Sequence, residues 1–172
     1  MPTALAATEQ YLFYPALAGD NVQALDLSKP CAANSAVSCG ILLAYGGTTF
    51  GLLLDTMIVR DNDLYWANDA QVYRADVAQN ASMSVKFTNQ LSSTLQFGPI
   101  SAFALGASFA YFAERGEGVS IIEKSSVSLT GQSPSVALAT TTAPASSFAL
   151  GSQQLYWTTS NCDIQSLVDF PQ

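Results

Sequence analysis

The chain has 172 residues and a formal net charge of −7, and 49% of its residues are hydrophobic but only 11% are charged. This length suits one compact domain with a sizeable core, and the apolar fraction argues against intrinsic disorder. Six Lys and Arg and no His argue against a nucleic-acid or anionic-membrane partner, and they remove the commonest general base and metal ligand.

Four windows of ten residues recur along the chain and align without a gap. Each begins with a short apolar segment, has polar or small residues in its middle and ends on aromatic residues. The last aromatic residues follow one another at intervals of 52, 46 and 45 positions. The windows are "LAATEQYLFY" (5–14), "MIVRDNDLYW" (57–66), "FALGASFAYF" (103–112) and "FALGSQQLYW" (148–157). They predict a repeated β-hairpin.

The middle of each hairpin is predicted to be a tight turn. In the second window the sequence "RDND" (60–63) is typical of turns between β-prone flanks. In the third and fourth windows Gly106 and Gly151 occupy the same place. We expect them to supply the positive φ that tight hairpin turns require.

Further strand-like segments follow each hairpin. The third segments of the repeats are "NVQALDL" (21–27), "QVYRADV" (71–77), "GVSIIEK" (118–124) and "CDIQSLV" (162–168). A fourth segment appears in three repeats: "GILLAYGG" (40–47), a stretch within 84–98 and "SVALATTT" (135–142). Four short antiparallel strands in about 45 residues match a β-propeller blade.

The predicted fold is therefore all-β, a β-propeller of four blade-like repeats in a single domain over residues 1–172. The repeats run approximately over 3–47, 55–98, 100–142 and 145–172. The last repeat lacks a fourth segment, so we expect either a partial propeller, completed by further blades or copies, or a four-bladed ring. The alternative fold is a β-sandwich in which the similarity of the four windows is coincidental.

The aromatic residues are predicted to belong to the core. Successive side chains of a strand face opposite sides, so Leu64 and Trp66 should point one way and Tyr65 the other. A blade is packed on both faces by its neighbours, and an aromatic pair gives each face a bulky group. We prefer this interpretation to an aromatic ligand cage.

The sequences "LYWAND" (64–69) and "LYWTTS" (155–160) resemble the YWTD-type and NHL-like β-propeller repeats of secreted bacterial proteins. At the position of the Asp of that motif this chain has Ala16, Asn68, Glu114 and Thr159. The resemblance implies a scaffold that binds proteins or glycans, in an extracellular or periplasmic setting that would need a leader not contained in this sequence.

Loops between the second and third strands are predicted to gather polar residues on one ligand-binding face. These residues are Asp20, Asn68, Asp69, Glu114, Arg115, Glu117, Asn161 and Asp163. Carboxylates on such a face could bind calcium through their oxygens, although no D-x-[DN]-x-[DN]-G loop is present. The alternative is a set of ordinary solvated turn residues. No catalytic residue and no other cofactor is predicted.

Cys31 and Cys39 lie eight positions apart and predict a local disulfide in an oxidising compartment. Cys162 would then be the odd thiol. The alternative is three buried free thiols, which pack as small hydrophobic groups.

Three functions remain open from the sequence. The favoured one is a non-catalytic extracellular scaffold for protein or glycan binding, which self-assembles if its open blade edge pairs with another copy. A structural subunit that forms a dimer or filament in this way is the second. The third is a carbohydrate-active hydrolase or lyase that uses loop carboxylates. The expected partners are other copies, further blades, and a protein or glycan ligand; neither nucleic-acid binding nor membrane insertion is expected.

Overall fold

The computed structural model describes residues 5–15, 21–28, 40–45, 57–61, 63–68, 71–76, 89–90, 98, 100–127 and 135–168. These residues form four small antiparallel sheets, which we name A to D in chain order. No helix among them is long and apolar enough to cross a membrane. The predicted all-β class is thus confirmed.

The strands of each sheet follow one another in chain order, as in a meander. Sheet A contains β1 (Ala6–Ala7), β2 (Tyr11–Pro15), β3 (Asn21–Asp26) and β4 (Gly40–Tyr45). Sheet B contains β5 (Met57–Arg60), β6 (Asp63–Asn68), β7 (Gln71–Asp76) and β8 (Asn89–Gln90). Sheet C contains β9 (Ile100–Leu105), β10 (Phe109–Arg115), β11 (Ser120–Ser126) and β12 (Val136–Thr140). Sheet D contains β13 (Ala145–Leu150), β14 (Leu155–Thr159) and β15 (Ile164–Leu167).

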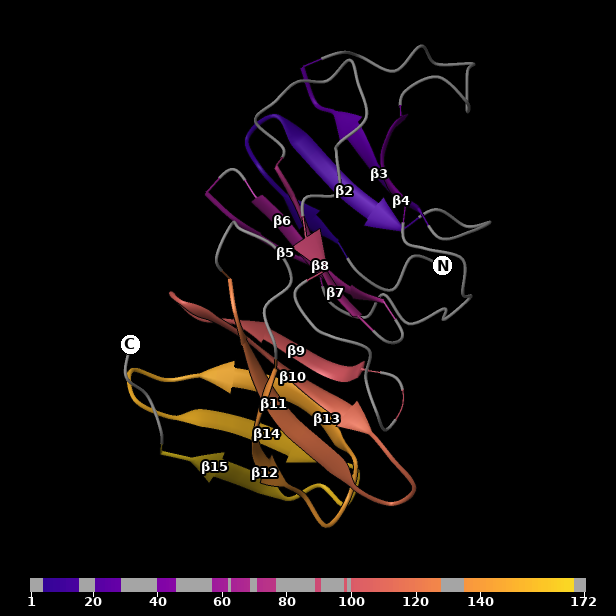
Figure 1. The fold of residues 1–172 in the computed structure, drawn as a ribbon. Helices are drawn as coiled ribbons and strands as arrows, with labels where there is room; N and C mark the ends of the chain where they lie inside the picture. The colour runs from indigo at the N-terminus through magenta and orange to yellow at the C-terminus, as the bar shows by residue number, and fades with distance from the viewer. Residues whose placement is uncertain are drawn as a thin grey trace.

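The four sheets succeed one another in space in the same order as in the chain (Figure 1). Strand β1 contacts β5, β6 contacts β9, and β9 contacts β13, so each sheet meets the next near its first strands. Sheet A lies at one end of the molecule and sheet D at the other (Figure 1). This is a propeller-like arrangement of consecutive small antiparallel sheets, of which three have four strands and sheet D has three in its described part.

Three hydrophobic clusters of the described residues fill the spaces between successive sheets. The first, between sheets A and B, contains Phe13, Val22 and Trp66. The second, between B and C, contains Tyr65, Val72 and Phe112. The third, between C and D, contains Tyr111, Ile122 and Trp157.

The alternation predicted for the aromatic residues is confirmed in sheet B. Leu64 and Trp66 belong to the cluster that faces sheet A, whereas Tyr65 belongs to the cluster that faces sheet C. All three side chains are at most 2% exposed. A sheet covered on both faces needs apolar groups on both, which is why the aromatic residues stand next to each other in the sequence.

The predicted hairpin turns are present, but the role predicted for two glycines is wrong. Among the described glycines, positive φ occurs at Gly98 and Gly118 and not at Gly106 or Gly151. The amide of Gly106 instead donates to the Phe109 carbonyl oxygen at 2.8 Å, and Gly151 repeats this geometry with Gln154. A Cβ at Gly106 would lie 3.0 Å from the ring of Tyr111, so the glycine makes room for an aromatic side chain.

Candidate functional site

Apart from Glu114, the predicted polar loop residues that the structure describes lie where the second strand of sheets B, C and D leads into the third. Asp20 and Asp69 lie outside the described residues, and Asn68 ends β6. Arg115 ends β10, and Glu117 follows it in the turn to β11. Asn161 and Asp163 lie in the turn between β14 and β15, and the last four are exposed: Arg115, Glu117, Asn161 and Asp163. In the described part of the chain no three His, Cys, Asp or Glu residues are placed to hold a metal ion.

Glu114 differs from the other predicted loop residues. It lies inside β10, opposite Ile121 and Ile100, and is 2% exposed. It shares the strand face of Phe112, two residues earlier, and so points toward sheet B. Thr159, at the equivalent place in sheet D, is also buried. These positions therefore belong to the spaces between sheets rather than to an exposed ligand-binding loop.

Of the three cysteines, the structure describes only Cys162. Cys31 and Cys39 lie outside the described residues, so the predicted disulfide stays a prediction. Cys162 is a free and exposed thiol in the turn between β14 and β15, where its φ is 65°.

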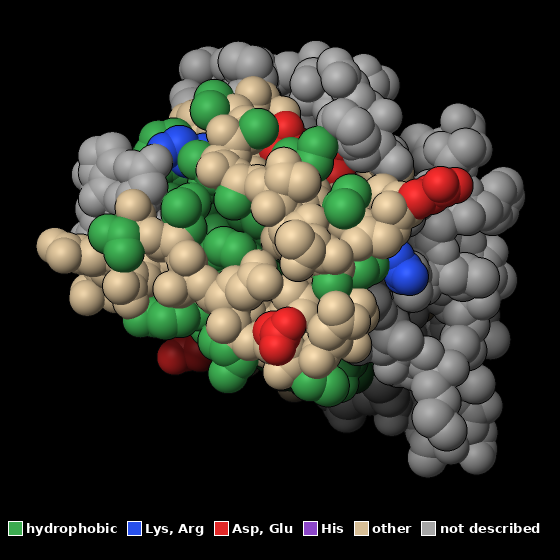
Figure 2. All heavy atoms as spheres, turned by 90° about the horizontal axis from the view of Figure 1, so that it is seen from below, with side chains coloured by type: hydrophobic (Ala, Val, Ile, Leu, Met, Phe, Trp, Pro, Cys, Tyr) green, Lys and Arg blue, Asp and Glu red, His purple; other side chains and the backbone are tan. Residues whose placement is uncertain are grey.

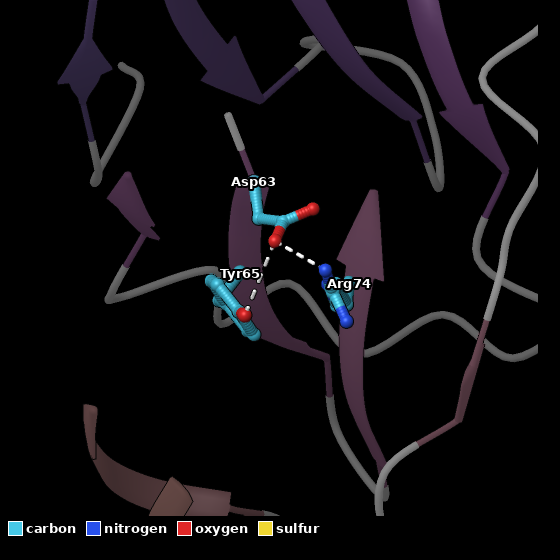
Figure 3. A network of polar contacts seen from close by, with 3 residues as sticks. All are labelled: Asp63, Tyr65 and Arg74. Atoms are coloured by element: carbon cyan, nitrogen blue, oxygen red, sulfur yellow. Dashed lines mark hydrogen bonds and ion pairs between the residues drawn. The ribbon is translucent and has the colours of Figure 1, made fainter. Parts of the chain in front are cut away.

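A cluster of three polar side chains lies on the face of sheet B that points toward sheet C (Figure 3). Arg74 on β7 forms an ion pair with Asp63 on β6, and the Tyr65 hydroxyl donates to the same carboxylate oxygen at 3.5 Å. The side chains of Arg74 and Asp63 are 8% and 15% exposed. The cross-strand register places Tyr65 opposite Arg74, which brings the three groups onto one face.

A second guanidinium joins this group from β5. The carbons at the centre of the Arg60 and Arg74 guanidinium groups lie 5.5 and 5.7 Å from the centroid of the Tyr65 ring, which is the range of cation–π contact. Arg60 also donates to the carbonyl oxygen of Gly106 in the β9–β10 turn. The cluster therefore ties sheet B to sheet C by polar contacts at the margin of their shared apolar layer.

The sequence does not predict this cluster. The residues "RDND" indicate a turn, and nothing in their pattern points to Arg74, eleven residues after Asp63. The available indication was that Arg60 and Arg74 are two of only six cationic residues and lie in the same repeat.

Burial raises the pKa of the Tyr65 hydroxyl above its usual value of 10.0, and Asp63 raises it further, whereas Arg74 and Arg60 lower it. A raised pKa in the folded state means that folding favours the neutral phenol. The corresponding stability is fully present below pH 10 and is lost as the pH rises through the folded-state pKa. We expect the free energy of unfolding of the wild-type chain to fall above pH 10 more steeply than that of a Tyr65→Phe variant.

This expectation is checked by urea unfolding at a series of alkaline pH values, followed by circular dichroism. Tyr156→Phe serves as the control, because Tyr156 is 37% exposed. An identical pH dependence for Tyr65→Phe and wild type would contradict the assignment of this effect to Tyr65.

Sheet D differs from the other sheets at its outer side. In sheets A, B and C the third strand pairs on its far side with a fourth strand, β4, β8 or β12. In the described part of sheet D the third strand, β15, pairs with β14 alone. Ile164 and Val168 at this edge are 76% and 68% exposed. Figure 2 views the molecule from below, the side on which sheet D lies in Figure 1, and shows hydrophobic side chains with few charged ones among them.

Comparisons with known proteins support the fold. No protein-family model matches the sequence, and no curated protein matches it significantly. The computationally designed Ika4 protein has a similar structure, with a TM-score of 0.66 and 14% identity over 98% of this chain and 91% of Ika4. Kluyveromyces lactis Hsv2 has a TM-score of 0.59 and 9% identity over 98% of this chain and 49% of Hsv2.

A third similar structure, BamB from Moraxella catarrhalis, has a TM-score of 0.46 and 15% identity over 99% of this chain and 58% of BamB. This chain thus spans about half the length of Hsv2 and less than two thirds of BamB, but nearly the whole of Ika4. The likeness to Ika4 and Hsv2, at 14% and 9% identity, concerns the fold alone.

Proposed function

We propose that the chain is a partial β-propeller of four blades, with repeats similar to the YWTD and NHL types, and that it acts as a non-catalytic extracellular scaffold. Its binding element is the open edge of β15, which accepts an extended strand from a protein partner or another copy. The observation that carries this proposal is the absence, among the described residues, of a fourth strand beside β15, where the three sister sheets have one.

The backbone geometry of β15 supports the proposal. The amide of Thr159 donates to the carbonyl oxygen of Asp163 at 3.0 Å, and pairing continues from Thr158 opposite Ile164 to Leu155 opposite Leu167. In an antiparallel ladder, residues alternate between facing the partner strand and facing away from it. The N–H and C=O groups of Ile164 and Ser166 therefore point away from β14, toward the open edge. An edge of this kind is a template for strand addition.

The sister sheets indicate which strand would fit. Strand β12, "VALAT", pairs antiparallel with β11, and β4, "GILLAY", pairs in the same way with β3. Both pairings have a register shift at the equivalent place, after Ile122 in one and after Val22 in the other. We therefore expect the partner strand to be short, uncharged, rich in Ala, Val and Leu, and bulged.

A carboxylate-based hydrolase or lyase is the weaker candidate. Glu117 and Asp163, the described carboxylates on the loops between second and third strands, are exposed to solvent. A general acid in glycoside hydrolysis needs an environment that raises its pKa, such as burial beside a second carboxylate.

The test uses a fluorescent peptide with the sequence of residues 135–142, "SVALATTT", as a surrogate partner strand, and its binding is measured by fluorescence anisotropy. We expect saturable binding to the wild-type chain and binding at least tenfold weaker to Ser166→Pro, because proline removes an N–H that faces the open edge. The matched control is Ser166→Ala, which keeps the N–H and should bind as wild type does.

A proline-containing version of the peptide, tested on the wild-type chain, makes the result independent of whether Ser166→Pro folds. It should bind at least tenfold more weakly than the parent peptide. The proposal is overturned if the parent peptide does not bind, or if both proline changes leave its affinity unchanged.

A further inference from the structure

The face of sheet D that points away from sheet C carries the residues that every other sheet uses to contact its successor. In sheets A, B and C the middle aromatic residue of the second strand faces the next sheet. These residues are Phe13, Tyr65 and Tyr111, and they are 0%, 2% and 3% exposed. The equivalent residue of sheet D is Tyr156, and it is 37% exposed.

A position on the third strand shows the same difference between sheet D and the other sheets. In sheets A to C this position lies opposite the residue that follows the last aromatic residue of the second strand. It is occupied by Val22, Val72 and Ile122. These side chains are 1%, 0% and 0% exposed and contact the next sheet. Ile164 occupies this position in sheet D, opposite Thr158, and is 76% exposed. At both positions, sheet D exposes on its outward face a side chain of the kind that sheets A to C bury against the next sheet.

The outward face of sheet A corresponds to the face that other sheets pack against the preceding sheet. In sheets B and D the residues on either side of the middle aromatic face the preceding sheet and are at most 5% exposed, as Leu64, Trp66, Leu155 and Trp157 show. The corresponding residues of sheet A are Leu12 and Tyr14, which lie on the face away from sheet B and are half-buried. The outward face of sheet A therefore carries the residues that in sheets B and D pack against the preceding sheet.

We propose that the outward face of sheet D docks on the outward face of sheet A of a second copy of this chain. This contact would resemble the contacts between sheets A and B, B and C, and C and D. It would thus continue a sheet-to-sheet interface that the chain already forms three times. Sheets A and D of the same chain lie at opposite ends of the molecule (Figure 1), which makes a second copy the occupant.

Charge is compatible with this docking. The outward side chains of sheet D are Ser147, Ala149, Tyr156, Thr158, Ile164 and Ser166, and those of β2 and β3 in sheet A are Leu12, Tyr14, Gln23 and Leu25. None of them is charged, so no unpaired charge would be buried in the layer. The two faces are different surfaces, so the contact is heterologous. Copies joined in this way close into a ring or extend into a filament.

The inference rests on the proposed function insofar as it treats the four sheets as successive blades, but it uses a different surface. The proposed strand-binding site is the backbone edge of β15, whereas the docking surface consists of the outward side chains of sheets D and A. A failure of docking leaves peptide binding to the β15 edge intact, and the two proposals are thus distinguished by the anisotropy experiment.

The experiment measures sedimentation velocity over a range of micromolar concentrations. We expect the wild-type chain to associate, and Tyr156→Lys and Ala7→Lys to be monomeric with at least hundredfold weaker association. Ala7 is exposed and lies opposite Leu12, so its lysine variant changes the sheet A face without disturbing the core. Ile164→Lys replaces Tyr156→Lys if that variant does not fold, and Val136→Lys is the control because Val136 is an exposed apolar residue of β12.

Mixing the two monomeric variants provides the decisive result. Ala7→Lys keeps an intact sheet D face, and Tyr156→Lys keeps an intact sheet A face. We expect an equimolar mixture to form a one-to-one dimer that stops there. A wild-type chain that stays monomeric throughout overturns the proposal, as does an Ala7→Lys variant that associates as wild type does, because the latter would mean that two sheet D faces pair with each other.

Discussion

Replacing Trp66 with alanine is expected to lower the free energy of unfolding by about 3 to 5 kcal/mol, the range for removal of a large aromatic side chain from a core. Trp66 is 1% exposed and stacks on Tyr73 with ring centroids 5.4 Å apart and planes 15° apart. It lies in the cluster that joins sheets A and B, together with Phe13 and Met57. The cavity left by its removal would weaken the whole layer.

Urea unfolding followed by far-ultraviolet circular dichroism measures this loss without relying on tryptophan fluorescence. The matched control is Tyr156→Ala, measured at concentrations at which the chain is monomeric. Tyr156 belongs to the same repeated aromatic motif as Trp66, but it lies on the outward face of sheet D. Its cost should stay below about 1 kcal/mol, as for a substitution away from the core. Equal losses for the two variants would show that the aromatic repeat does not distinguish covered from uncovered faces.

The second large effect is expected from Asp63→Ala, which should cost about 3 kcal/mol. Arg74 would then remain buried with a positive charge and without its carboxylate, and removing one partner of a buried ion pair is strongly destabilising. The loss is measured by urea unfolding at neutral pH. Asp163→Ala is the control, because Asp163 is an exposed carboxylate, and it should change stability by less than about 0.5 kcal/mol.

A double variant separates the ion pair from simple packing. Asp63→Leu combined with Arg74→Met removes both charges and replaces them with apolar side chains of similar size. We expect it to recover stability to within about 1 kcal/mol of wild type, since apolar replacements of buried pairs are often neutral. Losses that add up in the double variant would mean that the two residues act independently.

Much of the fold could be predicted because the strands repeat. The spacing of the aromatic residues and the turn residues between them located the hairpins, and the structure confirms strands in all four windows and in the third and fourth segments. The alternation of Leu64, Tyr65 and Trp66 gave the two covered faces of sheet B, because side-chain direction in a strand follows from local geometry.

The role of Gly106 and Gly151 could not be predicted in the same way. A glycine in a hairpin suggests positive φ, but here it makes room for the rings of Tyr111 and Tyr156. That reason depends on the position of a side chain several residues away. The same limit explains Glu114, which sequence analysis placed in a loop and the structure places in the space between two sheets.

By itself, the sequence determined the all-β class and the order of the strands, since these follow from local periodicity and turn chemistry. Only the tertiary structure decided which residues meet between sheets. The cluster of Asp63, Tyr65 and Arg74 depends on cross-strand register, and the exposure of Tyr156 and Ile164 depends on what packs against that face of sheet D. Register and layer order are long-range properties, so residues with the same local pattern become core in sheets B and C and open surface in sheet D.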